Sequence, residues 1–143
     1  MRVSTRAEYG IRALLDLAIH YGQGPVQSHE IARRQGLPVP YLNQLMVTLR
    51  RAGLVTSKRG PNGGHVLARP PEEITLREAF VVLEGSLAPW ECVQAGDVPC
   101  VYAPGCGVRP VWEAIRTAAE GVLNKMTLAD LLPDRPREPV RRA

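Results

Sequence analysis

The sequence predicts a mainly α-helical protein that contains one small β-hairpin. Apolar residues recur every three or four positions in five stretches, which is the repeat of a helix with one buried face. Two short stretches rich in β-forming residues flank a glycine-rich turn at 60–64, which indicates a hairpin. Glycine and proline separate these stretches and mark where they end.

The composition is that of a globular protein with a core made mainly of aliphatic residues. The chain has 143 residues, of which 45% are hydrophobic, but only two Trp, four Tyr and one Phe. This length fits one domain, or a small domain with an appended element. No apolar run approaches the ~20 residues of a membrane span, and residues 1–10 lead straight into helical pattern instead of a signal peptide. We therefore expect a cytoplasmic protein with no membrane partner.

The charge is distributed unevenly along the chain. Residues 1–70 contain ten Arg or Lys against three acidic residues, whereas residues 71–143 contain eight against eleven, and the whole chain carries +4. A basic first half indicates a polyanionic partner such as nucleic acid. An ordinary basic surface facing solvent is the alternative.

The first helix is expected to run from Thr5 to Tyr21. Ser4 or Thr5 is placed to cap it, and Glu8 lies in its first turn, where a carboxylate suits the helix dipole. Its buried face is expected to consist of Ala13, Leu14, Leu17, Ala18 and Tyr21.

Two further helices are predicted to form a helix-turn-helix. The second begins at the N-cap Ser28 and buries Ile31 and Ala32; after a glycine–proline turn, the third runs from Pro40 to Ala52. The inward stripe of the third helix is Leu42, Leu45, Met46 and Leu49. Its remaining face offers Tyr41, Asn43, Gln44, Thr48, Arg50 and Arg51. This arrangement is typical of DNA-binding modules, although helical hairpins without that function share it.

A β-hairpin directly follows the third helix and would form the wing of a winged helix. Its strands are expected at 54–59 and 65–68, joined by the turn at 60–64, where Asn62-Gly63 supplies positive φ. Lys58 and Arg59 lead into this turn and would reach backbone phosphates or a narrow minor groove. An ordinary hairpin with solvated charges is the alternative reading.

The second half of the chain places a cysteine segment between two helices. A fourth helix opens at Thr75 with a capping-box sequence and ends near Gly85. A fifth carries the longest apolar stripe of the chain: Val108, Val111, Trp112, Ile115, Ala119, Val122, Leu123 and Met126. Such a stripe predicts pairing with the same helix of a second chain, and packing on the protein's own first helix is the alternative.

These elements divide the chain into four parts. Residues 1–85 form the winged helix-turn-helix, 86–107 a glycine- and proline-rich loop that holds all three cysteines, and 108–132 the dimerisation helix with a short following turn. Residues 133–143 are charged and proline-rich, and are expected to be disordered.

Several motifs together resemble the bacterial Rrf-type winged-helix regulators, from Met1 to Leu132. The matching segments are 9–14 in the first helix, 41–45 in the third helix, 51–55 after it, 59–64 in the wing, and the three cysteines. The resemblance implies a homodimeric transcription factor that binds a double-stranded DNA operator. It also implies that an iron–sulphur cluster tunes DNA affinity in cysteine-bearing members.

The resemblance also implies which residues meet DNA. It makes Tyr41, Asn43 and Gln44 base readers and Arg59 the wing contact; Asn and Gln suit adenine. Asn43 departs from the acidic residue of IscR-like members, so their operator is not transferred. The full candidate set is Ser28, Pro40, Tyr41, Asn43, Gln44, Arg50, Arg51, Lys58, Arg59, Gly63 and Gly64.

The resemblance assigns Cys92, Cys100 and Cys106 as cluster ligands. Iron–sulphur clusters normally need four protein ligands, and Arg109 stands where IscR-like members supply a His. Glu8 matches an acidic ligand that NsrR-like members donate from the other chain, and the cysteine spacing is also closer to theirs. The implied cofactor is a [4Fe–4S] or [2Fe–2S] cluster that senses nitric oxide, redox or iron status.

The same residues are compatible with other functions. The cysteines could instead bind zinc or act as metal-free redox thiols, and Glu8 could simply be a dipole partner. A dimeric winged-helix adaptor that does not read DNA is a further alternative. An enzyme is not expected, because the sequence offers no nucleophile–base set and no phosphate-cradling glycine loop.

Overall fold

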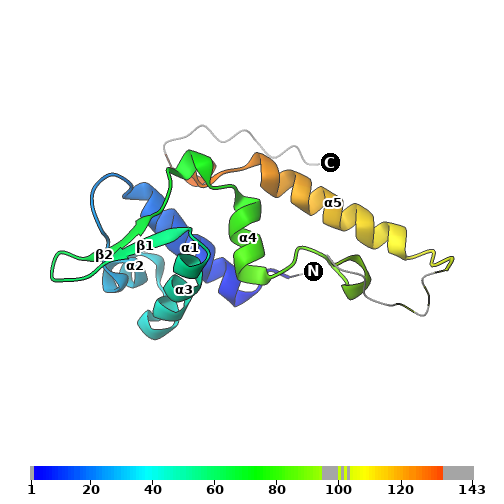
Figure 1. Ribbon diagram of the computed structural model, residues 1–143, viewed down its shortest axis with the longest axis horizontal. Coiled ribbons are helices and arrows are strands. Elements are labelled where there is room, and N and C mark those ends of the chain that lie inside the picture. Colours follow the sequence, from blue (N-terminus) through cyan, green and yellow to red (C-terminus); the bar gives the residue numbers. More distant parts are fainter. Residues whose placement is uncertain (1, 95–99, 101, 103, 134–143) are drawn as a thin grey trace.

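The computed structural model describes residues 2–94, 100, 102 and 104–133, and it confirms a mainly helical fold with one two-stranded antiparallel hairpin (Figure 1). The α-helices and strands are α1 Thr5–Ile19, α2 Ser28–Gln35, α3 Val39–Arg51, β1 Val55–Lys58, β2 Gly64–Leu67, α4 Leu76–Glu84 and α5 Arg109–Lys125. Three short 3₁₀ helices complete the described elements: η1 Pro71–Glu73, η2 Glu91–Val93 and η3 Leu128–Leu131.

The core lies where α1, α2, α3 and α4 meet. Its fully buried side chains are aliphatic and include Leu14, Leu42 and Leu49. Gly10 allows α4 to approach α1 closely, because a Cβ atom there would lie 2.4 Å from a methyl group of Leu83. The aliphatic core predicted from composition is therefore present, and its close helix contact depends on a glycine.

The helix ends differ from the predicted ones in two informative places. Ser4 caps α1 as expected, with its Oγ accepting from the Ala7 N–H at 3.1 Å, but α1 ends at Ile19 instead of Tyr21. The expectation that Ser28 caps α2 is wrong. Gln27 takes the N-cap position, and its N–H donates to the Glu30 carboxylate at 3.3 Å. The Ser28 side chain therefore does not cap α2.

The wing turns in a different way from the one predicted. The strands pair with Val55 opposite Leu67, but positive φ occurs at Gly60 and Gly64, and at no described residue other than glycine. The Gly63 N–H donates to the Gly60 carbonyl at 2.9 Å, so Pro61 and Asn62 occupy the centre of a β-turn. The expected positive φ at Asn62 is therefore wrong, because the fixed φ of Pro61 favours this turn instead.

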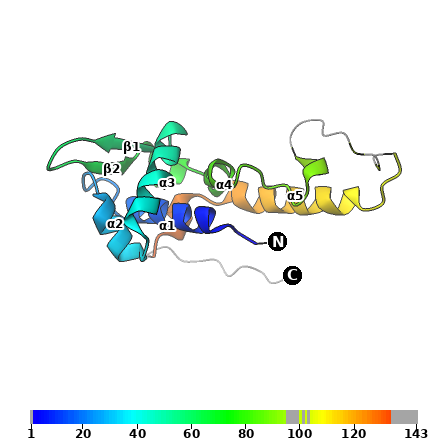
Figure 2. The same ribbon diagram turned by 90° about the horizontal axis from the view of Figure 1, so that it is seen from below.

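The chain returns to the core after α5. The Leu76 N–H donates to the Met126 carbonyl at 2.8 Å, and the Leu128 N–H donates to the Ile74 carbonyl at 3.0 Å. Leu128 and Ala129 are fully buried. One end of α5 is thus tied to the winged helix, whereas its other end projects away from it in both views (Figures 1 and 2). Beyond Pro133, the tail expected to be disordered lies outside the described residues.

Helix α5 has no buried residue in the single chain, although it carries the longest apolar stripe. Val108, Val111 and Val122 are 51%, 51% and 58% exposed, whereas Leu123 and Met126 pack against the core. Packing within the chain therefore leaves these three valines uncovered, while Trp112, Ile115 and Ala119 are half-buried. None of the helices in the described ranges is long and apolar enough to cross a membrane.

Candidate nucleic-acid interface and cysteine segment

The exposed face of α3 presents two polar side chains without a packing role. Asn43 and Gln44 are exposed, opposite the buried stripe of the same helix. Tyr41 is half-buried, and its ring packs edge-on against Tyr9 with the ring centroids 5.6 Å apart. Pro40 lies in the first turn, where a missing N–H costs no helical hydrogen bond. Of the three predicted base readers, Tyr41 therefore also helps hold α3 to α1.

Four basic side chains are exposed on α3 and on the strand that follows it. Arg50 and Arg51 are exposed at the end of α3, and Lys58 and Arg59 are exposed where β1 leads into the wing turn. The Arg50 guanidinium donates to the Ser57 hydroxyl at 3.4 Å, which links α3 to the wing. The end of α3 thus lies beside the start of the hairpin (Figure 1), and both elements carry exposed cations.

The glycine pair in the wing has a steric role. A Cβ atom on Gly63 would lie 2.2 Å from the Lys58 carbonyl oxygen, and one on Gly64 would lie 2.5 Å from the Val26 carbonyl oxygen. Both clashes are with backbone, which cannot move aside cheaply. These glycines shape the wing and let it approach the segment before α2.

A histidine links the wing to α2, which sequence reasoning did not find. The half-buried His65 ring lies between two hydroxyls, with Nε2 2.8 Å from Ser28 Oγ and Nδ1 2.9 Å from Ser57 Oγ. Burial lowers the pKa of His65, and the positive charge of Arg50 lowers it further. The neutral imidazole, with one donor and one acceptor, is therefore favoured.

A buried carboxylate fixes α1 to α2. Asp16 is 1% exposed and accepts two hydrogen bonds from Arg34, at 2.9 Å from Nε and 2.8 Å from Nη2. Gln35 adds a third at 3.2 Å. The hydrogen bond to Asp16 raises the pKa of Arg34. Sequence reasoning missed this ion pair, which orients the helix-turn-helix on α1.

The predicted metal ligands are not gathered within one chain. Cys92 lies in η2, so this part of the segment is a 3₁₀ turn instead of the expected loop, and Cys100 and Cys106 are half-buried free thiols. In the described ranges, no three His, Cys, Asp or Glu side chains are placed to hold a metal ion. Glu8 is exposed on α1, where its carboxylate accepts from Arg12 Nε at 2.6 Å.

Two arginines of α5 border the cysteine segment. Arg116 Nη1 donates to the Val93 carbonyl at 2.6 Å, while its Nε is buried and makes no hydrogen bond within the described chain. Arg109 donates to Glu113 at 2.9 Å. This hydrogen bond is the main reason why the pKa of Arg109 is raised, and the Cys92 and Cys100 thiols add to the effect. Arg116 thus ties the turn that contains Cys92 to α5, a contact that was not predicted from the sequence.

Comparisons with known proteins agree on one family. The family model Rrf2, described as an iron-dependent transcriptional regulator, matches residues 3–134. Protein rrf2 of Nitratidesulfovibrio vulgaris is 40% identical over 134 residues, covering 94% of this chain and 89% of that protein. The structure of T. potens IscR has 40% identity and a TM-score of 0.75, covering 100% of this chain and 93% of that one. CymR, the global cysteine regulator of B. subtilis, has 38% identity and a TM-score of 0.75, covering 92% and 95%.

Proposed function

The chain belongs to the Rrf2 family of transcriptional regulators, and from this membership we infer that it is a dimeric operator-binding protein whose DNA affinity depends on an iron–sulphur cluster held by its cysteines. It is a DNA-binding regulator and not an enzyme. The observation that carries the DNA-reading part is that α3 exposes Asn43 and Gln44 and carries exposed cations at the end that is hydrogen-bonded to the basic wing. The other parts of the proposal rest on the uncovered stripe of α5 and on the three thiols.

DNA recognition divides between these two elements. α3 would enter the major groove, where the amides of Asn43 and Gln44 can each form two hydrogen bonds with adenine. Lys58 and Arg59 would contact phosphates or a narrow minor groove beside it. Arg50 and Arg51, at the end of α3, would add phosphate contacts. Sequence is thus read by α3, and affinity is supplied mainly by the basic side chains.

Replacing Arg59 with Ala is expected to weaken DNA binding and to reduce its salt dependence. Each phosphate contact contributes about 0.9 to the slope of log K against log salt, so losing one wing contact per subunit lowers the slope of a dimer by about 2. The dissociation constant would be measured by fluorescence anisotropy from 50 to 200 mM salt, as a working range in which such slopes are large. The probe is a duplex selected from random DNA with the wild-type protein.

Lys125 supplies the matched control for the wing substitution. It is an exposed cation at the end of α5, away from the wing (Figure 1). Lys125→Ala is expected to leave the slope unchanged. An unchanged slope for Arg59→Ala as well would mean that the wing does not touch DNA.

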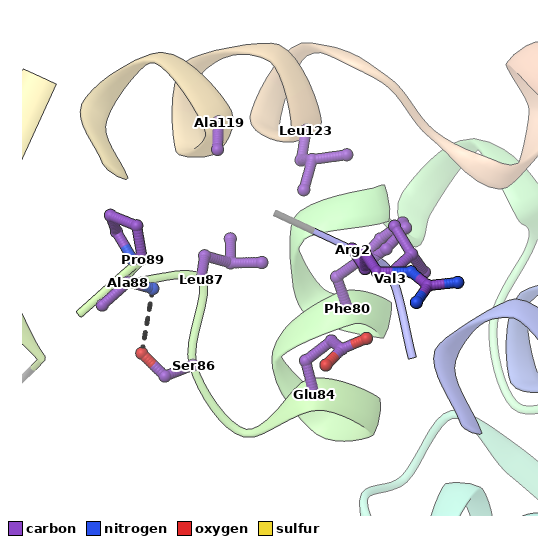
Figure 3. A pocket seen from close by; sticks show the side chains of 10 residues that line it. All are labelled: Arg2, Val3, Phe80, Glu84, Ser86, Leu87, Ala88, Pro89, Ala119 and Leu123. Carbon is purple, nitrogen blue, oxygen red and sulfur yellow. Dashed lines mark hydrogen bonds between the residues drawn. The ribbon is translucent and has the colours of Figure 1, made fainter. Parts of the chain in front are cut away.

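The partner proposed for α5 is the same helix of a second copy. A cavity of about 530 Å³ lies between α4, α5 and the first residues of the chain. Its apolar walls include Phe80, Leu87, Ala119 and Leu123 (Figure 3). Ala119 and Leu123 also belong to the predicted dimerisation stripe, so the cavity and the exposed valines are parts of one uncovered apolar surface. A second α5 laid along this surface would cover both.

Val111→Glu is expected to convert the dimer into monomers. A charge placed in a packed interface without a partner costs about 3–5 kcal/mol, which raises the dimer dissociation constant by at least about 100-fold. Sedimentation equilibrium would measure it. Thr117→Glu is the control, because Thr117 lies on the opposite side of the helix. If both variants stay dimeric, α5 is not the interface.

The cysteine segment offers the type of donor atom that an iron–sulphur cluster binds. Three thiols are the ligands such clusters prefer, and Arg109 with the buried Arg116 Nε supplies positive charge and a spare donor nearby. Cys92, Cys100 and Cys106 would hold the cluster, with Glu8 of a second copy as fourth ligand. A bound cluster would supply a redox-active group that reacts with nitric oxide or oxygen. The thiols would hold it, and Arg116 would keep the turn of Cys92 against α5.

Metal-free redox thiols are the second candidate for the same segment. The observation that favours them is that the cysteines are not gathered in the described chain, together with the structural similarity to CymR of Staphylococcus aureus in its oxidised form, at 32% identity and a TM-score of 0.75. Zinc is a third candidate on the same donors, and a structural zinc site would need a fourth ligand just as the cluster does. Measurement of bound iron and sulphide after reconstitution distinguishes an iron–sulphur cluster from metal-free thiols and from zinc.

A further inference from the structure

We infer that His65 is a positioning residue for phosphate binding, and that it orients the Ser28 hydroxyl so that its hydrogen can be donated to a DNA phosphate. The inference rests on the DNA-binding surface proposed above. Ser28 would be an uncharged donor of a hydrogen bond to a DNA phosphate. His65 would not touch the phosphate and would act only by orienting Ser28.

The imidazole is held in place by both its backbone and its ring. The His65 N–H donates to the Val26 carbonyl at 2.8 Å, and the Val26 N–H donates to the His65 carbonyl at 2.9 Å. Ser28 is two residues beyond Val26, at the first position of α2, and reaches Nε2 of the ring. The geometry thus joins the wing to the start of the helix-turn-helix at a fixed distance.

The contact from Arg50 to Ser57 indicates which groups donate in the hydrogen bonds of His65. An arginine can only donate, so the contact from Arg50 takes one lone pair of Ser57 Oγ and favours donation of the Ser57 hydrogen to His65 Nδ1. A neutral imidazole that accepts at Nδ1 must carry its hydrogen on Nε2. That hydrogen is donated to Ser28 Oγ.

The Ser28 hydroxyl is the other end of this chain of hydrogen bonds. Because Ser28 Oγ accepts from His65, its own hydrogen is left for a second acceptor. A phosphate oxygen is a strong acceptor for such a hydroxyl, and donors polarised in a chain bind it more strongly. The chain runs from Arg50 through Ser57 and His65 to Ser28, so the end of α3, the wing and α2 are oriented together.

The test is a double-substitution cycle on DNA binding. His65→Phe keeps the ring volume but removes both nitrogens, and it is expected to weaken binding to the selected duplex about tenfold per dimer, as for one modest hydrogen bond lost in each subunit. Ser28→Ala is expected to cause a similar loss. The two changes together are expected to lose no more than either alone, because they act in one chain. The salt slope should stay unchanged, since a hydroxyl releases no counterion.

Rescue and matched controls separate this role from a merely structural one. His65→Gln offers one acceptor and one donor at similar spacing, and it is expected to recover most of the affinity. His29→Phe replaces an exposed histidine of the same helix-turn-helix and should have little effect. Thermal unfolding checks that each variant is folded, and the glutamine variant keeps the test decisive if the phenylalanine variant is not.

Each other outcome counts against the inference in a distinct way. Additive losses for His65→Phe and Ser28→Ala would show that the two side chains act independently. A salt slope lowered by His65→Phe would show that the imidazole itself binds phosphate as a cation. If the wild-type protein selects no duplex, the proposed DNA-binding function fails first and this inference falls with it.

Discussion

Replacement of Arg34 with Ala is expected to lower the free energy of unfolding by about 3–5 kcal/mol. The reason is the burial of its partner. The Asp16 carboxylate is 1% exposed, and without Arg34 it keeps the Gln35 hydrogen bond at 3.2 Å and the His20 ring, whose Nδ1 lies 3.5 Å away. A buried charge left without its ionic partner is among the few single changes that destabilise a protein this much. Urea unfolding followed by circular dichroism measures the loss.

The neighbouring arginine provides the control for this substitution. Arg33 is exposed on the same helix, so Arg33→Ala is expected to change the stability by no more than about 0.5 kcal/mol. Arg34→Lys should fall between the two, because one ammonium cannot reproduce the two-pronged contact with the carboxylate. Equal stabilities for the Arg33 and Arg34 variants would show that the pair does not fix α1 to α2.

Substitution of any one of Cys92, Cys100 or Cys106 by Ala is expected to abolish stable iron–sulphur loading. Loss of a group that merely supports a metal ligand costs about 10–100-fold in affinity, and loss of the thiolate ligand itself should cost at least that. After anaerobic reconstitution with iron and sulphide, the wild-type chain should show visible absorption and bound iron. The three variants should show neither.

Glu8 needs its own comparison, because its carboxylate already has a partner. Glu8→Ala removes both a possible ligand and the ion pair with Arg12, whereas Arg12→Ala removes only the ion pair. Faster cluster loss in the Glu8 variant alone would support the ligand role. Identical behaviour of both variants and the wild type would remove Glu8 from the site while leaving the cysteines in place.

The helices and the wing were predictable because their signals are local. Apolar spacing located the α-helices of the described residues, and the glycine-rich turn located the hairpin. The errors arose where two local signals compete. Gln27 caps α2 although Ser28 is the commoner capping residue, and Pro61 moves the wing turn one step away from the expected Asn62-Gly63 pair.

The contacts that organise the site were not predictable, because they join distant parts of the chain. His65 and Ser28 are 37 positions apart, Arg34 and Asp16 are 18 apart, and Arg116 and Val93 are 23 apart. No spacing rule links such pairs, and each exists only once the helices have packed. Conversely, the exposed residues Asn43, Gln44, Lys58 and Arg59 were found from the sequence, because a polar face beside a buried stripe is a local pattern.

The state of the cysteine segment is expected to set the affinity for DNA. This dependence is tested most directly by the dissociation constant of one selected duplex, measured anaerobically with the reconstituted protein and with the same protein after removal of its metal. We expect the two constants to differ by at least about tenfold, within the usual range of coupling between two sites. A variant lacking all three cysteines should show no difference. Equal constants for the loaded and metal-free wild-type protein, with iron and sulphide bound in the loaded sample, would contradict the account.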